Sequence, residues 1–436
     1  MNVPRFSILI PTTGRAELVR TALASVLHQR FQDFEVVIAD SKRSDETRRV
    51  AEAPRDPRIR YVRTPEGGGA FIPWDFAPTQ ARGEYLLWLD DDNYLLPFAL
   101  EVLDGAIRRS GADIVTASHI YYYDSTNPRR FLRDCFGIVP FRGGEYRIDL
   151  REAVTRLFGF ARGGTVPWPR FHYSELAVSR AVAERVRRRL GFVLFTDGHY
   201  THSMQPILFA FARSCFFIDW PIVIVGRLGV SMSQSWSTAA RPRFARDPFR
   251  PRLSPVSAYT RINIVLENYL RVKELLPDLL GDVPIGLERF AEIHLRELAY
   301  LDTGLRTAIR NWREMFALLR RLAPGARHRL RASALRLALR APFVYAGRRL
   351  GLHKLSRAIR GFPTLRGKER LSAAEKLQGA KEFTVPFKKE DHIDSIAAFG
   401  LQARDVLLRE IGMDIERHPY AHHAESAAHA HGQARS

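Results

Sequence analysis

Three consecutive aspartates, Asp90, Asp91 and Asp92, directly follow the apolar run at residues 85–89. Carboxylates this close repel one another, so a cation is expected to compensate them at the end of a buried strand. Mg²⁺ or Mn²⁺ binds carboxylate and phosphate oxygens and leaves coordination positions for a substrate. A solvated acidic turn or a helix N-terminus would also tolerate such a cluster. The strand context favours a metal–phosphate site.

Polar residues also follow two other predicted strands. Pro11, Thr12 and Arg15 come after the first strand, and Asp40 comes after the second. In an open parallel sheet, ligands bind in the crevice at the carboxyl ends of the strands. The three polar clusters therefore predict one shared ligand site.

The elements that must position these residues alternate along the chain from residue 5 to about residue 120. Strands with helices between them indicate βαβ units. The expected fold class is thus α/β, with a mostly parallel, Rossmann-like sheet flanked by helices and followed by a helical C-terminal region. We expect strands at 6–10, 35–39, 58–62, 85–89 and 114–117 and helices at 16–29, 45–53 and 99–107.

The remainder of the chain changes character twice. A basic helix at 179–190 and a buried strand at 216–225 are expected before a Ser-, Pro- and Arg-rich stretch. Beyond it, Leu305, Ile309 and Trp312 begin an apolar stripe at helical spacing, continued by Phe316 and Leu319. The expected domains are a catalytic domain at 1–235, a linker at 236–258, a helical, basic region at 259–417 and a disordered tail at 418–436.

Composition excludes several classes of protein. Hydrophobic residues make up 46% and aromatic residues 11%, so disorder of the whole chain is not expected. The two cysteines, Cys135 and Cys215, form neither a disulfide framework nor a zinc ligand set, which indicates a reducing compartment. Neither a secretory signal nor a membrane-spanning run is recognised. A cytoplasmic location is therefore predicted.

Positive charge is concentrated in the second half of the chain. The formal net charge is +20, and residues 301–370 carry 18 Arg or Lys against three acids. No nucleic-acid-binding motif is present, and the aromatics lie on the apolar stripe, so no nucleic-acid partner is predicted. Two interpretations stay open: helices lying on an anionic membrane surface at the inner face, and a solvated, arginine-rich helical domain.

An ordered series of blocks resembles family 2 of the inverting glycosyltransferases, which have the GT-A fold. The blocks lie at 6–12, 23–29, 33–40, 44–47, 56–60 and 81–92, and the resemblance extends closely to residue 110 and loosely to residue 235. It implies a nucleoside-diphosphate sugar donor, with UDP or dTDP favoured, and a saccharide or lipid-linked acceptor. It also implies Mn²⁺ or Mg²⁺ as cofactor.

Carried over to this sequence, the resemblance implies roles for individual residues. The base would be bound by Asp40, ribose or sugar by Asp90 with Asp91 beside it, and the metal by Asp92. Other donor-binding residues would be Pro11, Thr12, Arg15 and Asp75, the last standing where the family more often has Asn. Ser41, Lys42 and Asn93 also depart from the family pattern and leave the donor's identity open.

An inverting transfer needs a general base for the acceptor hydroxyl. The resemblance implies Asp197 for this role, although a turn aspartate before Gly198 is a common alternative. Glu175 is the reserve candidate, or else a solvent-facing residue. His199 and His202 could complete the metal shell, or could be ordinary surface or core histidines.

The sequence thus predicts a hexosyltransferase-type enzyme of polysaccharide or glycoconjugate synthesis. Two alternatives remain: a nucleotidyltransferase that uses the same acids, and a non-catalytic nucleotide-sugar-binding or membrane-adaptor protein.

Overall fold

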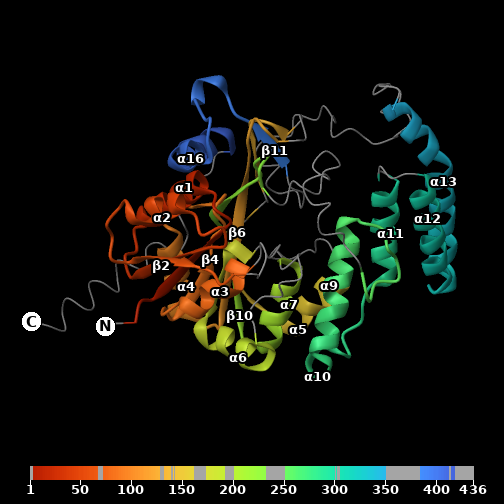
Figure 1. Cartoon of the computed structure of the whole chain (residues 1–436), viewed down its shortest axis with the longest axis horizontal. Coiled ribbons are helices and arrows are strands. Elements are labelled where there is room, and N and C mark those ends of the chain that lie inside the picture. The colour runs from red at the N-terminus through yellow and green to blue at the C-terminus, as the bar shows by residue number, and fades with distance from the viewer. Residues whose placement is uncertain are drawn as a thin grey trace, which may run out of the picture. The chain divides into compact units, whose positions relative to one another are not determined.

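The computed structural model describes most of the chain and divides it into two compact units (Figure 1). Unit 1 contains Met1–Glu152, Gly163–Gln234 and Leu371–Ser436, and unit 2 contains Ala153–Arg162 and Ser235–Arg370. The described residues are 3–66, 72–127, 132–138, 141, 143–161, 173–191, 201–231, 251–299, 301, 305–349, 383–411 and 414–417.

Within the described residues, unit 1 is built on an 11-stranded sheet. Its main path has the order β11-β7-β6-β9-β4-β1-β2-β3, and β10 pairs with β5, β6 and β8 beside that path. The strands are β1 (Phe6–Thr12), β2 (Phe34–Asp40), β3 (Ile59–Arg63), β4 (Tyr85–Trp88), β5 (Tyr94–Leu95), β6 (Ile114–Tyr123), β7 (Cys135–Ile138), β8 (Glu145–Ile148), β9 (Leu176–Ser179), β10 (Cys215–Gly226) and β11 (Phe383–Pro386).

Helices pack against this sheet. For example, α1 contacts β1 and β5, α3 contacts β1 and β2, and α4 contacts β6 and β10. The helices of unit 1 are α1 (Ala16–Leu27), α2 (Asp45–Glu52), α3 (Ile72–Gln80), α4 (Ala99–Ser110), α6 (Arg180–Leu190), α7 (Thr201–Phe211) and α16 (Ile396–Ile411), with short 3-10 helices η2 (Tyr173–Glu175) and η4 (Lys389–Asp391). The helix α5 (Leu150–Phe158) runs from one unit into the other in sequence.

The first four strands form the parallel part of the sheet. β1 pairs in parallel with β2 and β4, and β2 pairs in parallel with β3. Every residue of β1 and β2 is buried, as expected for strands covered on both faces. The register places Thr12 opposite Asp40, so both strands end at the same level.

The rest of the sheet is mixed. β9 lies between β4 and β6 and is antiparallel to both, while β10 is parallel to β6. The predicted α/β class is confirmed, with the parallel arrangement concentrated in the β3-β2-β1-β4 part.

A segment from late in the sequence completes unit 1. β11 pairs antiparallel with β7, and α16 contacts α1, β5 and β10. Phe399 of α16 is fully buried and stacks on Phe136 and Tyr122, at centroid distances of 5.4 and 6.1 Å. The indole Nε1 of Trp220 donates to the carbonyl of Ile415 at 2.9 Å. Residues that the sequence analysis placed in the helical C-terminal region therefore belong to the sheet.

Unit 2 is helical where it is described. In its core, Phe158 and Phe160 pack on Tyr269, and Phe160 also packs on Phe290. Ile309 is 52% exposed, so the apolar stripe expected around it is only partly buried. The helices are α9 (Arg261–Leu275), α10 (Pro277–Leu280), α11 (Leu287–Leu298), α12 (Leu305–Arg320) and α13 (Pro324–Arg349). Among the described residues, none of the helices combines the length and apolar character needed to cross a membrane.

Candidate active site

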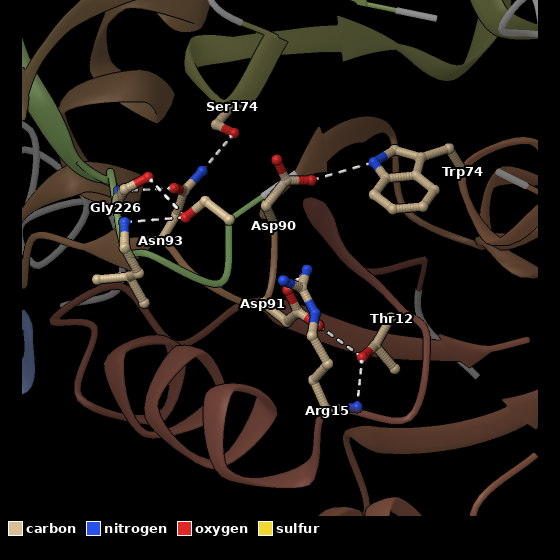
Figure 2. Close-up of polar contacts among 10 residues, drawn as sticks. Thr12, Arg15, Trp74, Asp90, Asp91, Asn93, Ser174 and Gly226 are labelled. Carbon is tan, nitrogen blue, oxygen red and sulfur yellow. Dashed lines mark hydrogen bonds and ion pairs between the residues drawn. The ribbon is translucent and has the colours of Figure 1, made fainter. Parts of the chain in front are cut away.

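The ends of β1 and β4 meet through direct side-chain contacts (Figure 2). Thr12 Oγ1 donates to Asp91 Oδ2 at 2.6 Å, and Arg15 Nε donates to the same oxygen at 3.0 Å. A second Arg15 nitrogen, Nη2, pairs with Asp91 Oδ1, so the guanidinium grips the carboxylate with two bonds. The predicted convergence of these two strand ends is therefore present.

A glycine lets the neighbouring turns approach one another. Gly14 has φ +78°, and a Cβ on it would lie 2.6 Å from Cβ of Lys42. The amide of Ser41 donates to the carbonyl of Thr12 at 3.1 Å. Only a residue without a side chain can take this backbone shape against Lys42 at low cost, so Gly14 joins the end of β1 to the end of β2.

Asp90 lies beside Trp74 of α3. The indole Nε1 donates to Asp90 Oδ1 at 3.0 Å, and Trp74 itself is only 1% exposed (Figure 2). Burial, and then the charges of Asp92 and Asp91, raise the pKa of Asp90 well above its ordinary value. The protein thus holds a carboxylate here whose negative charge is poorly compensated by its own groups.

Asp91 and Asp92 are both buried. Burial, opposed by Arg15 and reinforced by Asp92, raises the pKa of Asp91 to about 7. Burial also works against the charge of Arg15, but Asp91, Asp92 and Asp90 outweigh it and raise the pKa of Arg15. One arginine therefore faces three carboxylates.

This imbalance fits a divalent cation at Asp90 and Asp92. Arg15 and Thr12 occupy Asp91, whereas the pKa of Asp90 is raised by its carboxylate neighbours, which a bound cation would relieve. Within the part of the chain that the structure describes, no three His, Cys, Asp or Glu side chains make a complete metal site. Oxygens from a ligand such as a diphosphate would have to complete the shell.

Asp40 is fully buried at the end of β2. Its Oδ1 accepts from the amide of Lys42 at 2.9 Å, and its Oδ2 accepts from the amide of Ser44 at 2.8 Å and from the hydroxyl of Tyr61 at 3.1 Å. Asp40 therefore shapes the turn that leads to Ser44, the N-cap of α2.

The other predicted site residues are less tightly placed. Pro11 is buried in β1, next to Thr12, and Asp75 is partly exposed in the first turn of α3. His202 is partly exposed near the start of α7. Asp197 and His199 lie outside the described residues.

Two features of the site escaped the sequence analysis. Trp74 of α3 is the hydrogen-bond partner of Asp90, a contact between separate elements that the sequence does not reveal. Glu175 does not face solvent: it is fully buried and pairs with His119 of β6. Glu175 directly precedes β9, a strand that the sequence analysis did not predict, and nothing in the sequence pointed to the histidine as its partner.

A sheet whose parallel strands end in these groups defines a ligand-binding α/β protein of the nucleotide-binding type. Residues 7–162 match the family model described as glycosyl transferase family 2. The match covers the N-terminal part of unit 1 and extends into the short segment 153–162 that belongs to unit 2.

Two characterised relatives align with about a quarter of this chain. A β-1,3-glucosyltransferase of Campylobacter jejuni that acts on GalNAc(5)-diNAcBac-PP-undecaprenol is 33% identical over 109 residues, 23% of this chain and 34% of the relative. The poly(ribitol-phosphate) β-N-acetylglucosaminyltransferase TarS of Staphylococcus aureus is 31% identical over 116 residues, 26% of this chain and 20% of the relative. The chain thus spans about a third or less of the length of these relatives.

Two solved structures of glycosyltransferases align with much of the chain at low sequence identity. S. aureus TarS residues 1–349 in complex with UDP-GlcNAc aligns with a TM-score of 0.48 and 14% identity, covering 80% of this chain and 92% of that one. A mannosyltransferase of Pyrobaculum calidifontis in complex with GDP-Man and Mn²⁺ aligns with a TM-score of 0.32 and 17% identity, covering 79% of this chain and 88% of that one.

Proposed function

We propose that this chain is an inverting, metal-dependent glycosyltransferase that moves a sugar from a nucleoside-diphosphate sugar to an acceptor hydroxyl. The observation that carries the proposal is the cluster of Asp90, Asp91 and Asp92 at the carboxyl ends of β1 and β4, where Arg15 pairs directly with Asp91. The match of residues 7–162 to the model of glycosyl transferase family 2 supports sugar transfer as the use of that cluster.

The protein's own groups divide the work of holding the donor. Asp90 and Asp92 would hold Mn²⁺ or Mg²⁺, which supplies positive charge to a leaving diphosphate when bound. Asp91 would act by fixing Arg15 and Thr12, because both contact it directly. Arg15, which is 22% exposed on its side chain, would then offer its remaining N–H groups to phosphate oxygens.

The nucleoside would lie over the end of β2. Asp40 uses three of a carboxylate's roughly four acceptor positions within the protein, so the remaining one could accept the N–H of uracil or thymine. Because Asp40 is fully buried, a base would reach it only after a local rearrangement of the groups that cover it. Pro11 would line the same pocket, and Asp75 would contact the donor.

Inversion requires one displacement with a base beside the acceptor. Asp197 would take the proton from the acceptor hydroxyl as that oxygen attacks the anomeric carbon and the diphosphate leaves. His202 would contribute to the metal shell from the start of α7. The assignment of Asp197 comes from the family resemblance of the sequence, whereas that of His202 comes from its imidazole, an acceptable ligand for Mn²⁺ close in sequence to Asp197.

Calorimetry with UDP, dTDP, GDP and CDP, each with and without Mn²⁺, tests the donor site. UDP or dTDP is expected to bind, and only with metal. Asp90→Asn should remove the binding, whereas Asp104→Asn should keep it, since Asp104 of α4 pairs with Arg5, which precedes β1 at the opposite end of that strand from Thr12. If none of the four nucleotides binds, the proposal is wrong.

The released product distinguishes the two enzyme classes. A glycosyltransferase given an acceptor releases nucleoside diphosphate from the sugar donor, whereas a nucleotidyltransferase given a sugar phosphate and a nucleoside triphosphate releases pyrophosphate. A non-catalytic nucleotide-sugar-binding protein would bind the donor and release neither. Asp197→Asn should abolish release yet preserve donor binding.

We further propose that unit 2 docks on a membrane rich in anionic lipid, at the cytoplasmic face. From Pro324 to Arg349, the span of α13, the sequence contains seven arginines and no Asp or Glu. Leu335 and Leu339 are 56% and 64% exposed there, one turn apart, and Ile309 of α12 is also exposed. The acid of α12, Glu314, is occupied by the amide and hydroxyl of Ser257. Exposed leucines among arginines suit the interface of an anionic bilayer.

Sedimentation with phosphatidylglycerol vesicles tests this docking. The chain should be retained at low salt and released at roughly 1 M salt, where the screening length falls to about 3 Å. Leu335→Gln with Leu339→Gln should weaken retention, and Leu401→Gln, which alters a 71% exposed leucine of unit 1, should not. Absence of retention at low salt refutes membrane docking and leaves the solvated helical domain.

A further inference from the structure

A buried ion pair lies next to the candidate site but has no part in the proposed chemistry. His119 Nδ1 of β6 contacts Glu175 Oε1 of η2, and the two residues are 2% and 0% exposed. Two groups that can carry charge are costly to bury unless they have a structural or functional use. The contacts on either side of the pair indicate what that use is.

On one side, the pair leads to Asn93, the residue directly after the three aspartates. Asn93 Nδ2 donates to Ser174 Oγ at 2.8 Å, and Ser174 is the neighbour of Glu175 in sequence (Figure 2). Asn93 Oδ1 accepts from the amide of Gly226 at 3.0 Å. The side-chain amide of Asn93 therefore donates one hydrogen bond and accepts another. These two contacts fix the position of Asn93, the residue directly after Asp92.

On the other side, the pair leads to Arg227. The rings of His119 and Tyr121 meet edge to face with centroids 4.4 Å apart. The guanidinium carbon of Arg227 lies 4.8 Å from the centroid of the Tyr121 ring, within the range of a cation–π contact. Arg227 directly follows Gly226, so the chain of contacts returns to its starting point.

These contacts form a closed ring of residues: Asn93, Ser174, Glu175, His119, Tyr121, Arg227 and Gly226. Asp92 packs against it, because a Cβ placed on Gly226 would lie 2.0 Å from the carbonyl oxygen of Asp92. Arg227 also interacts electrostatically with Asp92. Burial disfavours the charge of Arg227, but Tyr121, Tyr123 and Asp92 outweigh this effect and raise the pKa of Arg227.

We propose that this ring, the Asn93 ring, is a positioning device for Asp92, which fixes the backbone so that the Asp92 carboxylate meets the same cation as Asp90. The inference rests on the proposed function, since it assigns the ring a task in binding metal and diphosphate. The ring also explains the asparagine at position 93. An aspartate there would bring a fourth negative charge and lose the N–H donor that reaches Ser174.

Three substitutions remove contacts of the Asn93 ring, in order of increasing disruption. Ser174→Ala removes one acceptor, Glu175→Gln keeps the shape but removes the charge, and Asn93→Ala removes both hydrogen bonds of the asparagine. Calorimetric dissociation constants for Mn²⁺ in the presence of saturating UDP are measured together with the melting temperature of the metal-free protein. Binding should weaken about 10- to 100-fold, as for other groups that orient a metal ligand, with Ser174→Ala nearest the lower end.

A matched control separates positioning from general stability. Ser7 Oγ donates to Glu35 at 2.6 Å and accepts from the amide of Gly83, buried near the opposite end of β1. Ser7→Ala should lower the melting temperature and leave the Mn²⁺ dissociation constant unchanged. The mild Ser174→Ala variant keeps the test valid if Asn93→Ala does not fold.

The outcomes distinguish failure of the proposed positioning role from failure of the proposed function. If the wild-type chain binds Mn²⁺ and UDP and all folded ring variants bind them equally well, the ring is structural only and the inference is wrong. If the wild-type chain binds no metal with any of the nucleotides, the proposed function fails and the inference falls with it.

Discussion

The strands β1, β2 and β4 end in the groups proposed to bind the donor, whereas β6 and β10 contribute groups that mainly contact other parts of the protein. Thr12, Asp40 and Asp90 come from the first set. His119 and Arg227 come from the second set or directly follow it. One part of the sheet thus supplies the candidate ligands, and the other part supplies residues that are proposed to position them. The comparison shows that binding residues and positioning residues can come from separate segments of one chain.

The sharpest test of this division is the loss of one proposed ligand. Asp92→Asn should slow sugar transfer about 1000-fold, because electrostatic stabilisation of a leaving diphosphate would be lost. Release of nucleoside diphosphate from the donor that binds is the measurement. Asp104→Asn serves as the control, and normal turnover by Asp92→Asn would remove the first half's special role.

A core residue that packs against the part of the sheet around β6 should affect the stability of the fold rather than ligand binding. Phe399→Ala should cost about 3–5 kcal/mol of unfolding free energy, because the ring is fully buried against Phe136 and Tyr122. Urea denaturation measures it. Leu401→Ala, two residues away and 71% exposed, should stay within about 0.5 kcal/mol of wild type. Equal effects of the two substitutions would contradict the packing described for α16.

Arg15 joins both roles, since it stabilises Asp91 and is proposed to bind phosphate. Arg15→Gln should lower the free energy of unfolding by about 2–3 kcal/mol at neutral pH. This is less than the roughly 3–5 kcal/mol lost when a fully buried pair is broken, because the side chain of Arg15 is 22% exposed. The control, Arg20→Gln, breaks an exposed pair with Glu17 and should change little.

The pH dependence of that loss has a definite sign. The pKa of Asp91 is raised to about 7, so its stabilising contribution is present below its ordinary value of 3.8 and is lost as the pH rises through about 7. Removing Arg15 raises the pKa of Asp91 further. The stability gap between wild type and Arg15→Gln should therefore be wider at about pH 8 than at about pH 5, and a gap independent of pH would contradict it.

The smallest expected effect concerns the His119–Glu175 pair. Burial alone would lower the pKa of His119, but Glu175 and then Tyr121 outweigh it and raise that pKa to about 9. The stability that the pair contributes is complete below the ordinary value of 6.5 and is lost as the pH rises through about 9. The melting-temperature difference between wild type and Glu175→Gln should shrink from about pH 6 to about pH 9.5.

The control is the ion pair of Arg5 with Asp104, which contains no histidine. The effect of Asp104→Asn on the melting temperature should be constant over the same range. A Glu175→Gln difference that also stays constant would mean that His119 carries no charge in the folded protein.

The first half of the sheet was largely predictable from sequence. β1, β2 and β4 and the helices α1, α2 and α4 lie within a few residues of their expected bounds, because a buried parallel strand is a continuous apolar run. The meeting of Thr12, Arg15 and Asp91 followed from the rule for strand ends. The roles of these residues remain proposals.

The second half was less predictable for physical reasons. β9 is four residues long and β11 pairs with a strand about 245 positions earlier, so local periodicity carries little of either pairing. The helix α3 contains Pro73 and Pro78. Because proline is unfavourable inside a helix, the sequence pattern did not indicate one there. The Asn93 ring depends on pairings between distant segments, which no single stretch of sequence reveals.

The late arrival of β11 and α16 has a consequence for biosynthesis. Unit 1 begins at the start of the chain, but its β7 edge and the aromatic face around Phe136 stay uncovered until residues 383–411 have left the ribosome. A bare strand edge beside apolar rings invites pairing with other chains. Translation products that stop within unit 2 should therefore aggregate or be degraded, so that only molecules extending past residue 411 accumulate.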